Sequence, residues 1–393
     1  MRDTPAIPAY ARRMTIAATT MPSPRLAPQR GGRSAYAKVM PAVFALLAGC
    51  AGPGPLQAPS RPADVHAEIT RRIPAHVPAR SDWAADIRDS FHAQDIEPGP
   101  ENICAVLAVI EQESGYQADP AVANLPRIAR GEIDRRAETM HIPKFLLDAA
   151  LAIRSPDGRS YSQRLSSVRT ERELSEIYED LIGSVPLGQR LFAGLNPVQT
   201  GGPMQVGIPF AQEHARDYPW PIAGSIRREV FTRRGGLYFG IAHLLGYRTP
   251  YTRKVHRFAD YNAGWYASRN AAFQNAVSVA SGTPLALDGD LLLPGAGLDE
   301  PGKTERALRA LGGPLDLDER AIRNALERGD RYEFDQTTLY ARLYALAERR
   351  AGKPLPRALI PGIKLQSPKI TRELTTGWFA TRVDERYRRC LQR

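Results

Sequence analysis

The spacing of hydrophobic residues along the chain predicts helices. Apolar side chains recur every four positions at Trp83, Ile87 and Phe91, which is the repeat of one helix face. The nearly uncharged run that follows predicts a second, largely buried helix over residues 100–114. Gly115 and the proline five residues later would stop it.

Beyond residue 124, helical patterns alternate with glycine, proline and polar breakers. Thr170 with Glu173 three positions on predicts a capping box, and residues 196–209 have the composition of a loop. The predicted helices cover residues 126–140, 143–153, 170–183, 227–248, 316–329 and 335–352. Because no run alternates with a period of two and no repeat of 20–50 residues is visible, the expected fold class is mainly α.

The start of the chain resembles a bacterial lipoprotein signal. A basic lead ends at Lys38, and residues 39–50 form an apolar run too short to span a bilayer but suited to a signal-peptide core. The run ends in "LAGC", which resembles the lipobox. The resemblance implies that Cys50 is lipidated as the first mature residue, and Ala51 after it favours the outer membrane, facing the periplasm. Translation could also start at Met21.

Charge and cysteine content exclude several classes of protein. The formal charge is +11, but residues 1–50 hold seven basic residues against one acidic, which leaves 46 against 41 for the remainder. Because this remainder is of mixed sign, we expect no nucleic-acid partner. The chain has no metal-ligand cluster of Cys and His and no glycine-rich phosphate loop, so we expect no metal and no cofactor. Cys104 and Cys390 could pair, but free buried thiols are the favoured interpretation.

Two glutamates end the buried helix over residues 100–114. At 100° per residue, Glu113 shares a face with Val109 and Ile110, while Glu111 lies about 200° away from it. Apolar walls would raise the pKa of Glu113 and keep it protonated, as a general acid requires. The alternative is that both carboxylates only solvate the end of a helix.

Two later segments have compositions unusual for connectors. "GGPMQVGI" contains Met204 and Gln205, and "ADYNAG" contains Tyr261 and Asn262. Together with "ESGY" at the end of the buried helix, and in this order, they resemble the three motifs of the lytic transglycosylases of the lysozyme-like superfamily. The resemblance covers roughly residues 100–125 and 196–275.

This resemblance implies the roles of the site residues. Glu113 would be the catalytic acid and base that cleaves the bond between N-acetylmuramic acid and N-acetylglucosamine in peptidoglycan, leaving 1,6-anhydro ends. The glycan strand would be held by Ser114, Met204, Gln205, Tyr261 and Asn262. There are departures from the family pattern: 92 residues separate Glu113 from Gln205, Pro203 replaces a leucine, and Asp260 precedes the tyrosine.

The expected organisation follows from these motifs. It comprises a signal peptide over residues 1–49, a tether over 50–80, a lysozyme-like domain over 81–281 with a helical insertion at 124–195, and a helical C-terminal extension over 282–393. In this extension Trp378, Phe379 and Tyr387 are expected to pack on the main body.

Two alternatives to the transglycosylase stay open. One is a hydrolytic muramidase of the same fold, which needs a second carboxylate, with Asp260, Glu171 and Glu173 as candidates. The other is an envelope lipoprotein that binds peptidoglycan without cleaving it.

Overall fold

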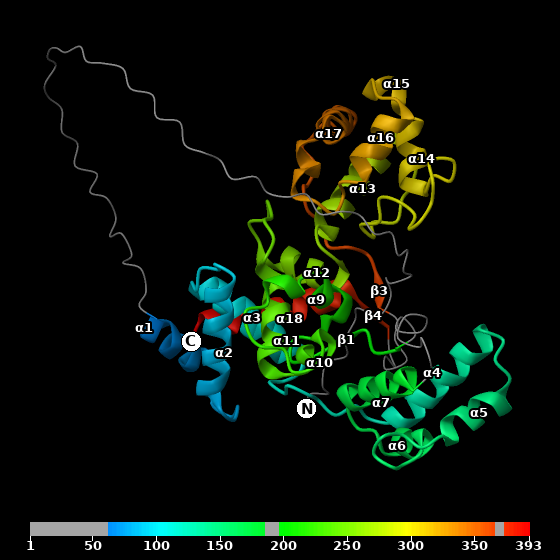
Figure 1. The fold of residues 1–393 in the computed structure, drawn as a ribbon. Helices are drawn as coiled ribbons and strands as arrows, with labels where there is room; N and C mark the ends of the chain where they lie inside the picture. Colours follow the sequence, from blue (N-terminus) through cyan, green and yellow to red (C-terminus); the bar gives the residue numbers. More distant parts are fainter. Residues whose placement is uncertain (1–61, 185–195, 366–372) are drawn as a thin grey trace, which may run out of the picture.

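The computed structural model describes residues 62–184, 196–365 and 373–393, and these are mainly helical, which confirms the predicted class (Figure 1). Strands in these residues form two short antiparallel pairs. β1 (Thr200–Gly201) pairs with β2 (Val206–Gly207), and β3 (Lys364–Leu365) pairs with β4 (Leu374–Thr375). The predicted lipid attachment at Cys50 lies outside the described residues.

The helix with the two glutamates lies in the first of three large hydrophobic clusters. Every residue from Ile103 to Ile110 is buried, because this helix has almost no polar face. Six helices build the cluster: α1 (Pro62–Arg72), α2 (Arg80–Ala93), α3 (Pro100–Glu113), α11 (Arg233–Leu245), α12 (Lys254–Ala263) and α18 (Thr376–Leu391). The C-terminal helix α18 packs on both α3 and α12. Phe379 and Tyr387 are buried in this cluster, as predicted.

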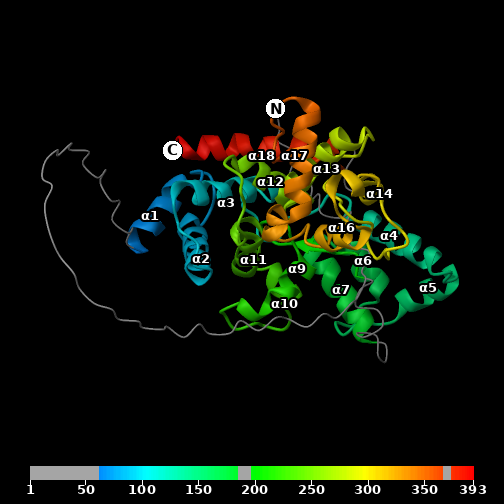
Figure 2. The same ribbon diagram turned by 90° about the horizontal axis from the view of Figure 1, so that it is seen from above.

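A second cluster joins the long insertion to the rest of the chain. The insertion forms a lobe that lies at the opposite end of the molecule from α1 in both ribbon views (Figures 1 and 2). Its core continues through Val206 and Ile208 to Phe239 on α11, so the lobe packs directly on the centre of the protein. The elements are α4 (Leu125–Thr139), α5 (Lys144–Ala152), α6 (Tyr161–Ser167), α7 (Glu171–Gly183), α9 (Ile208–Glu213), η3 (Ala215–Asp217) and α10 (Ile226–Val230).

The third cluster forms another lobe after the YNAG segment. Arg269 ties it together: this fully buried side chain donates hydrogen bonds of 2.8 Å to the carbonyl oxygens of Gly329 and Arg331. The elements are α13 (Ala267–Ser281), α14 (Lys303–Arg309), α15 (Gly312–Leu315), α16 (Glu319–Leu326), η4 (Tyr332–Gln336) and α17 (Thr338–Ala351).

Side-chain caps and backbone breaks decide where several helices begin. The capping box of Thr170 and Glu173 at α7 is confirmed. The single helix predicted over 227–248 is wrong: the chain breaks after Val230, and Thr232 accepts a 2.9 Å hydrogen bond from the Gly235 N–H to start α11. The chain also breaks between α12 and α13, at Gly264, whose φ of 110° is incompatible with a helix.

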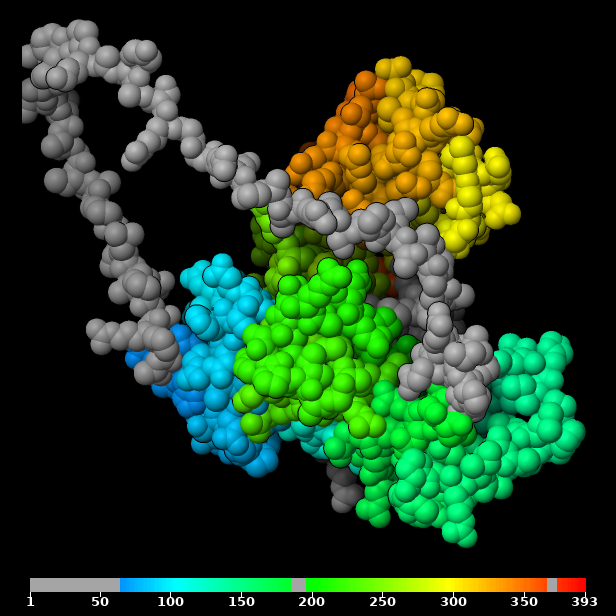
Figure 3. Space-filling model, in the orientation of Figure 1, coloured from blue at the N-terminus to red at the C-terminus, as the bar shows by residue number. Residues whose placement is uncertain are grey.

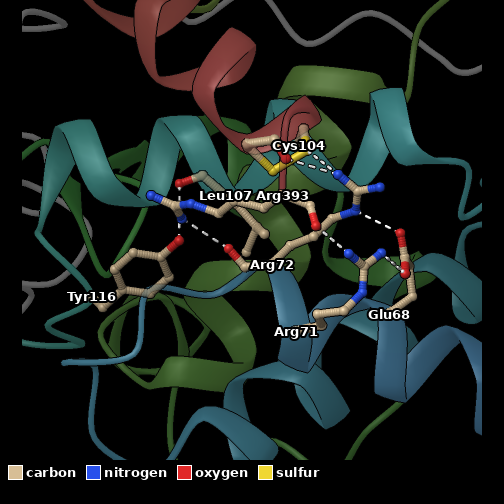
Figure 4. The surroundings of a disulfide bond; sticks show 8 residues. Glu68, Arg71, Arg72, Cys104, Leu107, Tyr116 and Arg393 are labelled. Atoms are coloured by element: carbon tan, nitrogen blue, oxygen red, sulfur yellow. Dashed lines mark hydrogen bonds and ion pairs between the residues drawn. A yellow bond between two sulfur atoms is a disulfide. The ribbon is translucent and has the colours of Figure 1, made fainter.

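The two cysteines form a disulfide, so the prediction of free thiols is wrong. The Cα atoms of Cys104 on α3 and Cys390 on α18 lie 5.5 Å apart, within the normal range for a bridge. Buried Arg72 donates a 2.8 Å hydrogen bond to the Cys390 carbonyl oxygen and pairs with Glu68 at 2.6 Å (Figure 4). The bridge joins α3 to the C-terminal helix, and the bond from Arg72 adds α1 at the same place. The sequence separation of 286 residues gave no local sign of this proximity.

Candidate functional site

Glu113 is the last residue of α3, and its side chain is buried. The residue is 5% exposed, and its Oε2 atom has no hydrogen-bond partner. Burial raises the pKa of Glu113 well above its ordinary value, and the nearby negative charge of Glu171 raises it further. The pKa shift expected from the helical phase is therefore confirmed, and the group is favoured in its protonated form.

Glu111, two residues earlier, has a different environment. Its Oε1 atom lies 3.4 Å from Arg386 Nε and 3.5 Å from an Arg389 guanidinium nitrogen, both on α18. This half-exposed carboxylate links α3 to the C-terminal helix. The two glutamates thus differ in the way that helical phase predicts, one buried and one in ion pairs at the surface.

The insertion brings Glu171 close to the end of α3. Backbone pairing joins the two segments, since Val122 N–H donates a 2.9 Å hydrogen bond to the Arg169 carbonyl oxygen. An ion pair of 2.8 Å between Arg172 and Asp119 fixes the same junction. Glu171, the first residue of α7, is therefore held next to the chain that leaves Glu113.

The GPMQ segment is the turn of the β1–β2 hairpin. Met204 is fully buried, and Gln205 has a left-handed backbone with φ 51°. The Gln205 side chain bonds within the turn, accepting from Thr200 Oγ1 at 3.2 Å and donating to the Gly202 carbonyl oxygen at 3.4 Å. These bonds hold the turn in one shape.

Glycines on α11 let this turn lie against the helix. A Cβ atom at Gly236 would lie 2.4 Å from Pro203 Cδ and 2.6 Å from the Val230 carbonyl oxygen. A Cβ atom at Gly240 would lie 2.6 Å from Met204 Sδ. Because no side chain fits at these two positions, the GPMQ turn can pack closely against the glycine-containing helix.

Tyr261 connects the second and third motifs. Its hydroxyl donates a 2.6 Å hydrogen bond to the Met204 carbonyl oxygen. Behind it lies His243, with Nε2 3.2 Å from the Tyr261 carbonyl oxygen, and burial lowers the pKa of this imidazole to about 4. Asn262 Oδ1 accepts a 2.8 Å hydrogen bond from Thr376 at the start of α18. Met204 and Tyr261 also share the first cluster with α3.

Asp260 and Ser114 have structural partners. Asp260 is fully buried and accepts hydrogen bonds from the Ser268 N–H at 2.7 Å and the Tyr247 hydroxyl at 3.2 Å. Burial raises its pKa to about 6. The Ser114 hydroxyl donates to the Ile110 carbonyl oxygen at 3.1 Å. Of the three candidates for a second carboxylate, Glu173 is used in the capping box, so Glu171 is the one close to Glu113.

An aromatic group beside the third motif was not predicted. Trp265 stacks on Tyr247 with ring centroids 4.7 Å apart, and its indole N–H donates a 2.8 Å bond to the His243 carbonyl oxygen. Phe210 on α9 and His214, directly after this helix, lie against it. The only signal in the sequence was the tryptophan directly after YNAG, since its partners are distant in the chain. A pocket of about 240 Å³ opens beside it, between residues 263–267 and residues 289–292 and 326–330, and Glu113 does not line this pocket.

Within residues 62–184, 196–365 and 373–393, no group of His, Cys, Asp and Glu is arranged to hold a metal ion. In the same ranges no helix has the length and hydrophobicity needed to cross a bilayer.

Comparison with known proteins gives two matches. Residues 76–393 match the sequence profile of a family described as a protein of unknown function, DUF1615. The chain is also 57% identical over 349 residues to the uncharacterised protein YaiW of Escherichia coli K12, an alignment that covers 88% of this chain and 95% of that protein. No solved structure matches.

Proposed function

This chain belongs to the DUF1615 family, and we propose that it is a peptidoglycan lytic transglycosylase with a lysozyme-like fold. The observation that supports this most strongly is Glu113, a buried carboxyl group with an unpartnered oxygen and a raised pKa. It stands at the end of the helix that precedes the GPMQ and YNAG segments in the motif order of that enzyme class.

The proposed reaction uses Glu113 twice. Its protonated carboxyl gives the proton to the glycosidic oxygen as the bond from muramic C1 to that oxygen breaks. The resulting carboxylate then takes the proton of the muramic 6-hydroxyl group. As it does so, the oxygen of this hydroxyl forms a bond to C1 and closes the anhydro ring. No water is consumed, and Glu113 ends protonated. Proton transfer of this kind contributes about 10²–10⁴ in rate.

The other site residues hold the glycan in this proposal. Tyr261 positions the GPMQ turn through its bond to the Met204 carbonyl oxygen. In this proposal fully buried Met204 supports the turn from the core side, and Gln205 contacts the sugars. Ser114 and Asn262 contact the sugars from the ends of α3 and α12. No cofactor takes part.

A hydrolytic muramidase is the second candidate, and Glu171 is the observation that favours it. A second carboxylate near the acid could direct a water molecule to C1, as hydrolases with two carboxyl groups do. The two reactions differ in their products, because anhydro ends are lighter than reducing ends by one water.

Digestion of purified sacculi with residues 51–393 tests the proposal, with products read by mass spectrometry. We expect anhydro-muropeptides from the unaltered protein and a loss of about 10²-fold or more for Glu113→Gln. Glu111→Gln is the matched control, since it makes the same chemical change on the same helix at a carboxylate paired with α18. Reducing ends would indicate the hydrolase. Undiminished products from Glu113→Gln, or no product from any form, would reject the assignment of Glu113.

We also propose that the protein is anchored in the outer membrane by lipid on Cys50 and faces the periplasm. The disulfide between Cys104 and Cys390 is consistent with this, since such bridges persist in oxidising compartments. Labelling cells with an alkyne fatty acid tests it. Label on the unaltered chain and none on Cys50→Ser is the expected result, and label on both forms would contradict it.

A further inference from the structure

The tip of the insertion exposes an unusual group of large apolar side chains. Over the segment 140–153, which contains α5, five of them are exposed: Met140 44%, Ile142 38%, Phe145 69%, Leu146 51% and Ile153 52%. The other exposed large apolar residues of the described chain, Ile222, Leu293 and Leu391, are far apart in sequence. We call the five residues the α5 patch.

The α5 patch follows from the orientation of the helix. Phe145 and Leu146 lie on one face of α5, whereas Leu151, about 180° from their mean direction, is buried against the second cluster. The helix therefore buries Leu151 in the core and leaves Phe145 and Leu146 exposed to solvent. Figure 3 shows this lobe projecting from the body of the molecule.

The lobe that carries the patch has an excess of basic residues. Residues 124–170 contain nine Lys and Arg against five Asp and Glu, whereas α7 behind them is acidic. Lys144 and Arg135 are largely exposed even though each has an acidic neighbour. An apolar helix face on a lobe with a net positive charge is the pattern of a segment that lies in the interface of a membrane containing anionic lipids.

The size of the patch argues against a second copy of the chain as its occupant. Five side chains exposed to this degree offer on the order of 400 Å² of apolar surface. A stable dimer buries about 800 Å² on each partner. A lipid surface needs no matching partner of that area, because each inserted side chain gains from burial separately.

The sequence also places a bilayer within reach. If Cys50 is lipidated as proposed, the 12 residues to the start of α1 at Pro62 span at most about 40 Å. Because α1 and α5 lie at opposite ends of the molecule, a second contact at α5 would lay the protein along the membrane (Figures 1 and 2).

We propose that the α5 patch is a membrane-docking surface, with Phe145 and Leu146 inserted below the headgroups of a bilayer that contains anionic phospholipid. This goes beyond the proposed glycan chemistry and requires neither the activity of Glu113 nor the lipid on Cys50. Where Cys50 also carries its lipid, both ends of the protein would touch the same leaflet.

Co-sedimentation with vesicles tests the proposal. The protein used is residues 51–393, which has no lipid anchor and keeps every described contact. We expect it to bind vesicles of phosphatidylethanolamine with phosphatidylglycerol, more weakly those of phosphatidylcholine alone, and to lose affinity about tenfold or more in Phe145→Glu/Leu146→Glu. Leu293→Glu, at a side chain 51% exposed on another lobe, is the matched control and should bind unchanged.

Two further measurements make the outcome decisive. Thermal unfolding must show that the double variant keeps its fold, as expected for side chains that are mostly exposed. In Phe145→Trp, the tryptophan emission should shift to shorter wavelength on vesicles. Three results would each overturn the proposal. The unaltered protein could fail to bind vesicles, or the double variant could bind them equally well. Alternatively, the unaltered protein could sediment as a dimer that the double substitution dissociates.

Discussion

The carboxyl group of Glu113 combines burial with the lack of a hydrogen-bond partner for one oxygen. A buried carboxyl of this kind costs stability when it ionises, because the charge has neither water nor a cation beside it. A residue that serves only to solvate a helix end has no such cost, and Glu111 with its two arginines is an example on the same helix.

This cost predicts how stability depends on pH. The unfolded chain releases the Glu113 proton near its ordinary pKa, while the folded chain holds it to higher pH. Between these two pKa values the unfolded state binds fewer protons, so stability falls as pH rises, by up to about 1.4 kcal/mol per pH unit. Glu113→Gln should remove this fall, and urea unfolding between pH 5 and 8 measures it. Parallel curves for Glu113→Gln and Glu111→Gln would contradict the prediction.

Glu171 gives a second prediction at this scale. Its negative charge raises the pKa of Glu113, so Glu171→Gln should lower that pKa. If protonated Glu113 is the acid, the basic limb of kcat/KM moves to lower pH in this variant. Glu176→Gln, further along α7, is the control and should leave the profile unchanged. A loss of activity at all pH values without a shift of the limb would indicate the hydrolytic role of Glu171 instead.

At the scale of elements, the GPMQ turn and the glycines of α11 act as one unit. Gly236→Ala should destabilise the protein by about 1–3 kcal/mol, because its Cβ atom would meet Pro203 and the Val230 carbonyl oxygen. Gly131→Ala is the matched control inside α4: nothing lies within 4 Å of its Cβ position, and it should stabilise by about 0.5–1 kcal/mol. Denaturant unfolding of both variants tests the difference, and equal shifts would contradict it.

The same unit shows what the sequence could predict. Helix positions followed from apolar spacing, and the phase of α3 separated Glu113 from Glu111 correctly, because both depend on neighbours within a few residues. The break between α10 and α11 was not predicted, because the apolar pattern continues through it. The structure starts a new helix there, since the Thr232 side chain caps the N-terminus of α11. The bond from Tyr261 to Met204 and the approach of Glu171 to Glu113 join residues 57 or more positions apart, and only folding reveals such contacts.

For the whole molecule, the disulfide is the longest-range covalent constraint. Cys104 and Cys390 lie 286 residues apart, and removing a bridge that closes so long a loop increases the entropy of the unfolded chain. We expect Cys104→Ala/Cys390→Ala to lower the free energy of unfolding by about 2–5 kcal/mol. Unfolding with and without reductant provides the check: reductant should destabilise the unaltered protein and leave the double variant unchanged.

The bridge also places the C-terminal helix in the central core. α18 contacts α3 and α12, and its first residue holds Asn262 of the third motif. The segment after residue 282 therefore contributes a lobe of its own and then returns to complete the cluster that contains the candidate site.

The covalent link between Cys104 and Cys390 makes nearly three quarters of the chain a closed ring. A protease that cuts one peptide bond within this ring opens it without releasing a fragment. Such a nicked molecule keeps its full mass on a non-reducing gel, and two pieces separate only after the thiols are reduced. In a compartment rich in proteases, damage of this kind would leave the helices that surround Glu113 joined to each other.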